Sequence, residues 1–132
     1  MKIRIFLNRL VYKITSPKAG DVVVFLPNGN EKSHYYVKRV VAVPGDELYV
    51  KNGILYVNNE VQDEYINDKI AEAGLAENKI ELGDDEYFVI GDNCNNSEDS
   101  RYGDIGNINK KYIVGKVWFI ISPKDKFGFL KG

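Results

Sequence analysis

Alternation of apolar and polar residues is the main pattern along this chain, and it predicts short β-strands. In residues 1–14, Ile3 and Ile5 alternate with charged side chains, as in a strand that buries one face. Residues 21–26 (DVVVFL) and 34–43 (HYYVKRVVAV) are rich in Val and Tyr, which is typical of more deeply buried strands. Stretches rich in Pro, Gly and Asn separate these segments and indicate turns.

The clearest local prediction is a hairpin over residues 47–59 (ELYVKNGILYVNN). Asn52-Gly53 lies between its two alternating runs, and this dipeptide favours the positive φ values of a tight two-residue turn. A further strand is expected at 86–92 and a strand pair at 111–122, after which residues 123–132 are expected to pack their two Phe against the fold. The pattern therefore predicts a mainly β, antiparallel fold with hairpin connections.

Residues 60–86 differ from the rest because they are acidic and lack regular alternation. Within them, 66–77 (INDKIAEAGLAE) is the only stretch with helical character. We expect a small insertion or cap of mixed structure at roughly 60–84. The length of 132 residues fits one domain, 1–132, with a core of its own.

Composition excludes several classes of protein. The formal net charge is −1, whereas a nucleic-acid-binding domain usually carries a strongly basic surface. No apolar run approaches the ~20 residues of a membrane-spanning helix. Lys2, Arg4 and Arg9 interrupt the apolar residues at the start, so a secretory signal sequence is not indicated there.

A cysteine nucleophile is not favoured. Cys94 is the single cysteine, so it has no partner within the chain for a disulfide, and the single histidine, His34, is 60 positions away. A catalytic thiol needs a nearby base, usually histidine. We interpret Cys94 as a loop thiol on the solvent side.

Three segments carry the chemistry. They are 20–25 (GDVVVF), 35–48 (YYVKRVVAVPGDEL) and 91–103 (GDNCNNSEDSRYG). In this order and at these separations, they resemble the sequence boxes of type I signal peptidases, the bacterial leader peptidases. The resemblance covers nearly the whole chain and is weakest at 60–84.

This resemblance implies a fold, a reaction and a location. The fold would be the antiparallel β-sheets or partly open barrel of the signal peptidase type. The reaction would be removal of Ala-x-Ala-type signal peptides from exported preproteins by a Ser–Lys dyad, with no cofactor and no metal. The domain would lie on the outer face of the bacterial cytoplasmic membrane, held by an N-terminal anchor outside this chain.

The family's functional residues match positions in two of the three segments. Lys38 of YVKR would be the general base, and Ser97 would orient it. The residues that would support them or shape the loop are Arg39, Asp92, Asn93, Asp99 and Arg101.

The chemistry of lysine agrees with this assignment. A free lysine has a pKa near 10.4, and it accepts a proton only when neutral. Burial disfavours the ammonium form, and Lys38 is flanked by Val37 and Val40. A hydroxyl such as that of Ser97 would hold the amine without stabilising its charge. Taken alone, Lys38 reads as a solvated strand lysine, and the companion segments favour the catalytic interpretation.

The substrate is expected to lie extended beside residues 35–38, pairing through its backbone as an added strand. By resemblance, Val24, Tyr36 and Val37 would line the shallow pockets that accept Ala one and three positions before the cut. They could equally be ordinary core residues, which is an even alternative for Val24. An open strand edge also invites another chain, so strand-edge self-association of this chain is expected.

The resemblance fails at the nucleophile. The family has a Ser-Met-x-Pro-Thr-like box shortly before the first strand, whereas Ser16 is the first serine here. Ser33, Ser100 and Ser122 match no nucleophile position either. We therefore expect the chain as given to be inactive. Cys94-Asn95 is a smaller departure, since Arg-Asp or Arg-Asn is common there.

Two explanations remain open for the missing serine. The chain is either a piece of an active serine endopeptidase, which the base Lys38 favours, or a non-catalytic relative that binds or assembles exported or pilin-like subunits. A self-cleaving repressor-type Ser–Lys protease would need an internal Ala-Gly site. KAGD at 18–21 contains Ala-Gly, but the 91–103 loop is not expected in that class.

Overall fold

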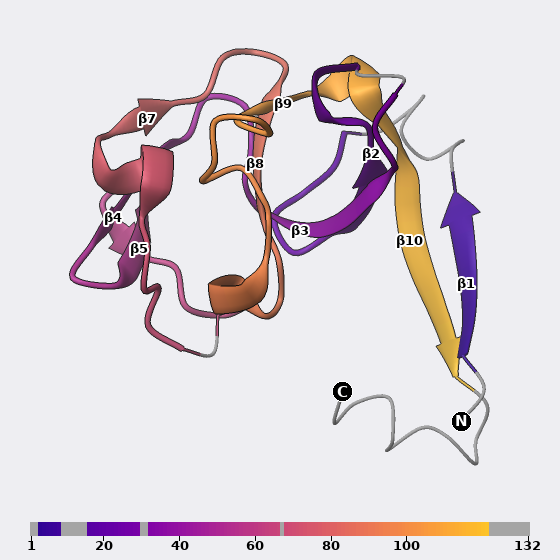
Figure 1. Ribbon diagram of the computed structural model, residues 1–132, viewed down its shortest axis with the longest axis horizontal. Coiled ribbons are helices and arrows are strands. Elements are labelled where there is room, and N and C mark those ends of the chain that lie inside the picture. Colours follow the sequence, from indigo (N-terminus) through magenta and orange to yellow (C-terminus); the bar gives the residue numbers. More distant parts are fainter. Residues whose placement is uncertain (1–2, 9–15, 30–31, 67, 122–132) are drawn as a thin grey trace.

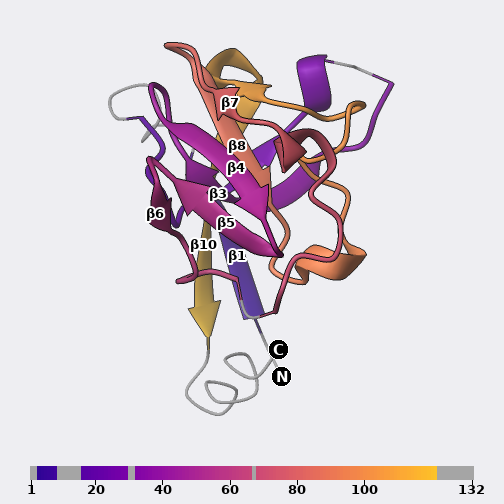
Figure 2. The same ribbon diagram turned by 90° about the vertical axis from the view of Figure 1, so that its left-hand side faces the viewer.

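Two antiparallel β-sheets make up the protein, and their strands follow the turn punctuation of the sequence. The computed structural model describes residues 3–8, 16–29, 32–66 and 68–121. The larger sheet has the order β1-β10-β2-β3-β8-β9 and the smaller sheet β6-β5-β4-β7 (Figures 1 and 2). The larger sheet contains β1 (Ile3–Asn8), β2 (Val22–Phe25), β3 (Tyr36–Ala42), β8 (Glu86–Ile90), β9 (Ile108–Asn109) and β10 (Ile113–Ile121). The smaller contains β4 (Glu47–Lys51), β5 (Ile54–Val57), β6 (Glu60–Val61) and β7 (Ile80–Glu81).

The described residues contain no α-helix, and their helical turns are short 3₁₀ segments. These are η1 (Pro27–Gly29), η2 (Gly74–Glu77), η3 (Cys94–Asn96) and η4 (Lys110–Tyr112). The mainly β, antiparallel prediction is therefore confirmed.

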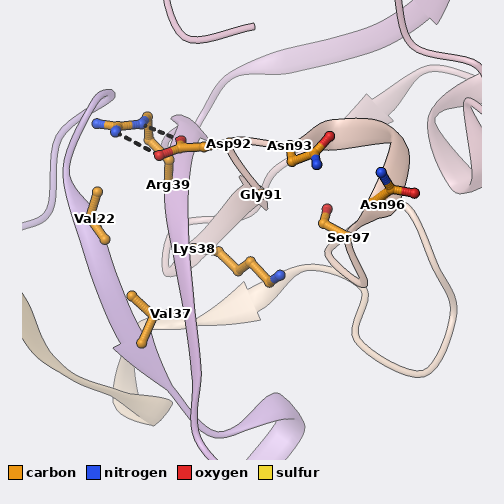
Figure 3. A pocket seen from close by; sticks show the side chains of 9 residues that line it. All are labelled: Val22, Val37, Lys38, Arg39, Gly91, Asp92, Asn93, Asn96 and Ser97. Carbon is orange, nitrogen blue, oxygen red and sulfur yellow. Dashed lines mark hydrogen bonds and ion pairs between the residues drawn. The ribbon is translucent and has the colours of Figure 1, made fainter. Parts of the chain in front are cut away.

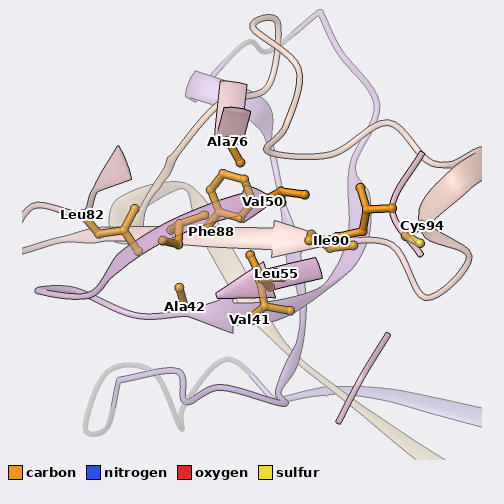
Figure 4. Close-up of a cluster of buried hydrophobic side chains, with 11 residues drawn as sticks. Val41, Ala42, Val50, Leu55, Ala76, Leu82, Phe88, Ile90 and Cys94 are labelled. Carbon is orange, nitrogen blue, oxygen red and sulfur yellow. The ribbon is translucent and has the colours of Figure 1, made fainter. Parts of the chain in front are cut away.

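Adjacent residues of β3 and β8 face two different cores. Val40 and Val89 lie in one cluster with Val23 and Phe25, whereas Val41 and Phe88 face the smaller sheet. Side chains alternate across a strand, so one strand can serve both clusters. The cluster between the sheets is drawn in Figure 4, and its buried members are Val41, Ala42, Leu48, Val50, Leu55, Ile70, Ala76, Leu82, Phe88, Ile90 and Cys94.

The hairpin prediction is confirmed, with β4 and β5 joined at Asn52-Gly53. Their φ values are 53° and 79°, and Lys51 pairs with Ile54 across the turn. Both residues occupy the left-handed region, which Asn and Gly enter at low cost.

Two local predictions are wrong and one lies outside the described residues. The helical character expected at 66–77 reduces to η2, because Gly74 at φ 58° lets the chain turn tightly against the backbone of Arg101. The pair of strands expected at 111–122 is one strand, β10, whose register shifts between Ile113 and Gly115. Beyond that shift β10 pairs with β1 in an arm that extends from the body (Figure 1). The expected packing of 123–132 falls on residues that are not described.

Candidate active site

Lys38 lies on β3 at the point where the neighbouring strand β8 ends. β3 pairs with β2 from Tyr36 to Arg39, whereas its pairing with β8 begins only at Arg39, opposite Ile90. Lys38 is half-buried, and its side chain points toward the loop after β8 (Figure 3). A hollow of about 300 Å³ opens there, lined by Val22, Val37, Lys38, Arg39, Gly91, Asp92, Asn93, Asn96 and Ser97.

Gly91 brings Lys38 and Ser97 together. A Cβ built at Gly91 would lie 2.6 Å from Ser97 Oγ and 3.4 Å from Lys38 Nζ. The two side chains therefore approach each other across a residue that has no side chain. The sequence motifs alone gave Gly91 no role, although Gly91 is the first residue of the 91–103 segment.

The Ser97 hydroxyl does not bond directly to the lysine. Ser97 Oγ donates to Asp99 Oδ2 at 2.5 Å, and no hydrogen bond joins Ser97 and Lys38 within the described part of the chain. The sequence led us to expect a direct contact between the Ser97 hydroxyl and the Lys38 amine. In the structure both side chains line the same hollow, and the hydroxyl bonds to Asp99 instead. Asp99 fixes the hydroxyl because its own carboxylate is held in place.

Asp99 and Arg101 form the buried base of the loop. Arg101 Nε and Nη2 donate to the two carboxylate oxygens of Asp99 at 2.9 and 3.0 Å, and neither side chain is exposed. The Gly91 and Arg101 amides donate to the same carboxylate. Burial alone would lower the pKa of Arg101, but its hydrogen bonds and charge pairing with Asp99 raise that pKa overall.

Arg101 also satisfies backbone carbonyls. Its Nη1 donates to the Glu72 carbonyl at 3.0 Å, and its Nη2 donates to the Cys94 carbonyl. The departure at Cys94-Asn95 therefore leaves the loop's ion pair intact. Cys94 is buried in the core between the sheets, so the expectation of a loop thiol on the solvent side is wrong.

Arg39 pairs with Asp92 at the start of the same loop. Its Nε and Nη2 donate to Asp92 at 2.8 and 3.0 Å, and Nη1 donates to the Gly20 carbonyl at 2.9 Å. The hydrogen bond to Asp92 is the main cause that raises the pKa of Arg39. The Tyr65 ring lies 5.3 Å from the guanidinium, so the insertion also contacts this pair.

The three residues expected to contact substrate are placed differently. Val37 lines the hollow and is 52% exposed. Val24 is its cross-strand partner on β2 and shares its face, but does not line the hollow. Tyr36 does not line it either, since its ring stacks on Phe25 and its hydroxyl donates to Glu98 at 3.2 Å.

The backbone N–H and C=O of Val37 point to the edge of β3 that lies beyond the end of its pairing with β8. The Val40 amide and carbonyl bond to β2-side residues Asp21 and Gly20. Backbone groups alternate sides along a strand, so those of Val37 point the other way. Within the described ranges no strand pairs with Val37 on that side, and an extended peptide could be added there.

Ser97 is the only described serine that lines the Lys38 hollow. Ser100 is fully buried, with its Oγ accepting from the Val89 amide at 2.9 Å. Ser33 donates to the His34 carbonyl, and Ser16 accepts from Lys110 Nζ. None of these three is placed to exchange a proton with Lys38.

Comparison with known proteins shows which family the sequence matches. The family profile described as "Signal peptidase, peptidase S26" matches residues 1–122. Signal peptidase I P of Bacillus subtilis subsp. natto is 38% identical over 97% of this chain and 72% of its own length. Signal peptidase IB of Staphylococcus aureus (strain MRSA252) is 38% identical over 96% of this chain and 72% of its own.

A further relative and a solved structure are also similar to this chain, the structure in its fold. A probable signal peptidase I-2 of Synechocystis sp. is 32% identical, with 96% of this chain covering 58% of that protein. A crystal structure of a signal peptidase I from Enterococcus faecalis V583 superposes with a TM-score of 0.62 at 23% identity, covering 78% of this chain and 97% of that one. Residues described here include no helix long and apolar enough to cross a membrane.

Proposed function

This chain belongs to the signal peptidase family, peptidase S26, and we propose that it carries the general-base half of a Ser–Lys endopeptidase that removes signal peptides from exported preproteins. The observation that carries the proposal is the placement of Lys38 and Ser97 on either side of Gly91, in a hollow bordered by Val37. A lysine at the end of a strand pairing, beside an open strand edge, is where an extended peptide and a base would meet.

In this proposal Lys38 moves the proton. Its amine takes the proton of an attacking serine hydroxyl and later returns it to the leaving amine of the peptide. Ser97 and the buried Asp99–Arg101 pair hold the wall of the hollow against which the amine rests. The nucleophile would come from a Ser-Met box of the family type, because Ser97, the described serine that lines this hollow, donates its hydroxyl to Asp99.

The substrate would be an extended signal peptide that pairs with the free side of β3. Backbone hydrogen bonds to Val37 would recognise any sequence, and its small exposed side chain would favour Ala near the cut. The reaction would take place on the outer face of the bacterial cytoplasmic membrane, where exported preproteins emerge.

The test joins residues 1–132 to a Ser-Met box of the family type and follows cleavage of an Ala-x-Ala peptide by mass spectrometry. We expect cleavage by the fused enzyme and none by residues 1–132 alone. Lys38→Met should lower the rate of the fused enzyme by roughly 10²–10⁴-fold, because general-base catalysis contributes that much. Lys51→Met, at an exposed position of β4, is the matched control and should leave the rate unchanged.

Two results would overturn the proposal. Cleavage by residues 1–132 alone that disappears in Lys38→Met would place the nucleophile within this chain. A folded fused enzyme that binds the peptide but never cuts it would instead support the non-catalytic binding protein.

A further inference from the structure

Asn95 connects the catalytic loop to the insertion through two hydrogen bonds. Its Oδ1 accepts from the Ala71 amide at 2.9 Å, and its Nδ2 donates to the Lys69 carbonyl at 3.0 Å. These are the backbone groups that a neighbouring strand would use, so the amide side chain substitutes for a strand partner. Asn95 is exposed, yet both of its polar ends are committed.

The same insertion segment also holds the far end of the loop. The Leu75 amide donates to the Arg101 carbonyl at 2.7 Å, and Arg101 Nη1 donates to the Glu72 carbonyl at 3.0 Å. At Gly74 a Cβ would come within 2.2 Å of the Arg101 carbonyl oxygen, so the two backbones are in close contact. Residues 69–75 therefore touch the loop on both sides of Ser97.

This segment is itself fixed to the core. Ile70 and Ala76 are buried in the cluster between the sheets, which also contains Cys94. Cys94 immediately precedes Asn95. The loop and the insertion are therefore joined both by apolar packing around Cys94 and by the hydrogen bonds of Asn95. A shift of residues 69–75 would be transmitted to the loop.

We propose that Asn95 is a positioning residue: together with residues 69–75 it sets the place of Ser97, and hence the wall of the Lys38 hollow. The inference rests on the proposed function. It gives the insertion a role in the reaction. Asn95 does not touch the reacting atoms and acts through the loop.

The amide is chemically specific. Aspartate at position 95 would still accept from the Ala71 amide but would lose the donor to the Lys69 carbonyl and place a charge beside it. Alanine would lose both bonds. Because the freed backbone groups lie at an exposed site, water can satisfy them, so the loop should loosen without unfolding the protein.

The experiment compares Asn95→Ala and Asn95→Asp with Asn78→Ala, which changes an exposed asparagine at the C-cap of η2. In the fused enzyme we expect kcat to fall by roughly 10- to 100-fold in Asn95→Ala, since small misplacements near the reacting groups cost that much. KM should stay within about twofold, because Asn95 acts on the wall of the Lys38 hollow and not on the β3 edge at Val37, where the peptide would bind. The kcat of Asn95→Asp should lie between those of Asn95→Ala and the unmodified fused enzyme. The kcat of Asn78→Ala should equal that of the unmodified enzyme.

A second readout uses residues 1–132 without any added box. Asn95→Ala should speed hydrogen exchange at the Gly91 and Arg101 amides, both of which donate to Asp99, while the urea midpoint stays near that of Asn78→Ala. The inference is overturned if Asn95→Ala changes neither kcat nor hydrogen exchange at the Gly91 and Arg101 amides. It is also overturned if the fall in kcat is no larger than the fraction of the variant that is unfolded. If the fused enzyme with Asn95 intact does not cleave, the proposed function fails, and exchange alone then decides whether Asn95 holds the loop.

Discussion

Asp99 and Arg101 are two positions apart, and their side chains form a bidentate ion pair in which neither is exposed. Arg101 is also the largest fully buried side chain among the described residues. An ion pair in such a place contributes little net stability, but losing one partner leaves the other charge buried and unpaired.

Arg101→Met should therefore be strongly destabilising, by about 3–5 kcal/mol, because Asp99 and two carbonyls lose their partner. Urea unfolding of residues 1–132 measures the change. Arg39→Met is the matched control: its partner Asp92 is 65% exposed, so its loss should cost no more than about 1 kcal/mol. Equal losses for the two variants would contradict the buried role of the Asp99–Arg101 pair.

Gly91→Ala tests the close approach of Lys38 and Ser97. A Cβ there would lie 2.4 Å from Ser97 Cβ, so Ser97 must move, and overpacking of this kind costs about 1–3 kcal/mol. Gly103→Ala is the control, since a Cβ at Gly103 meets nothing within 4 Å. A crystal structure of Gly91→Ala should show Ser97 displaced from the hollow, and an unmoved Ser97 would show that the approach is not tight.

Ser97→Ala should affect the reaction more than the fold. The hydroxyl gives one hydrogen bond to Asp99, whose carboxylate keeps its bonds to Arg101 and to the Gly91 amide. We expect a loss of about 1 kcal/mol in unfolding free energy and a clear fall in cleavage by the fused enzyme. Ser33→Ala, which removes a local bond to the His34 carbonyl, should change neither measurement. Full cleavage by the Ser97→Ala variant would show that Ser97 has no role in the reaction.

Val37→Ala should change peptide recognition. Removing two methyl groups from the border of the hollow should weaken binding of an Ala-x-Ala peptide by about 1–1.5 kcal/mol, measured by calorimetry, and should admit larger residues one or three positions before the cut. Val61→Ala is a close match in exposure, 53% against 52% for Val37, and lies on the distant strand β6. The same binding profile in both variants would exclude Val37 from the substrate site.

The strands were largely predictable because period-two alternation and turn residues report local backbone geometry. Asn52-Gly53 is an example, since its positive φ values are a property of those two residues. The single strand β10 was not predictable from its sequence, because Gly115 reads as a break and only the pairing with Phe25 and Val24 shows that it is a register shift.

The site was predictable only in part, for a related reason. The motifs identify Lys38, Ser97, Asp99 and Arg101 but do not say which hydrogen bonds they form. Whether the Ser97 hydroxyl turns to the amine or to the carboxylate depends on competing acceptors in three dimensions, and here it turns to Asp99. The contacts of Asn95 join residues 24 and 26 positions apart, so no local pattern signals them.

Among the strands that the structure describes, the early end of the β3–β8 pairing leaves one side of β3 without a partner at Val37. A peptide that fills this position binds the folded chain and not the unfolded one, so it raises stability by mass action, by about 2.7 kcal/mol at a hundredfold excess over Kd. The melting temperature of the chain should therefore rise with the concentration of any fitting peptide, including peptides that are never cut. Recognition of signal peptides could thus be ranked by heating the protein, separately from catalysis.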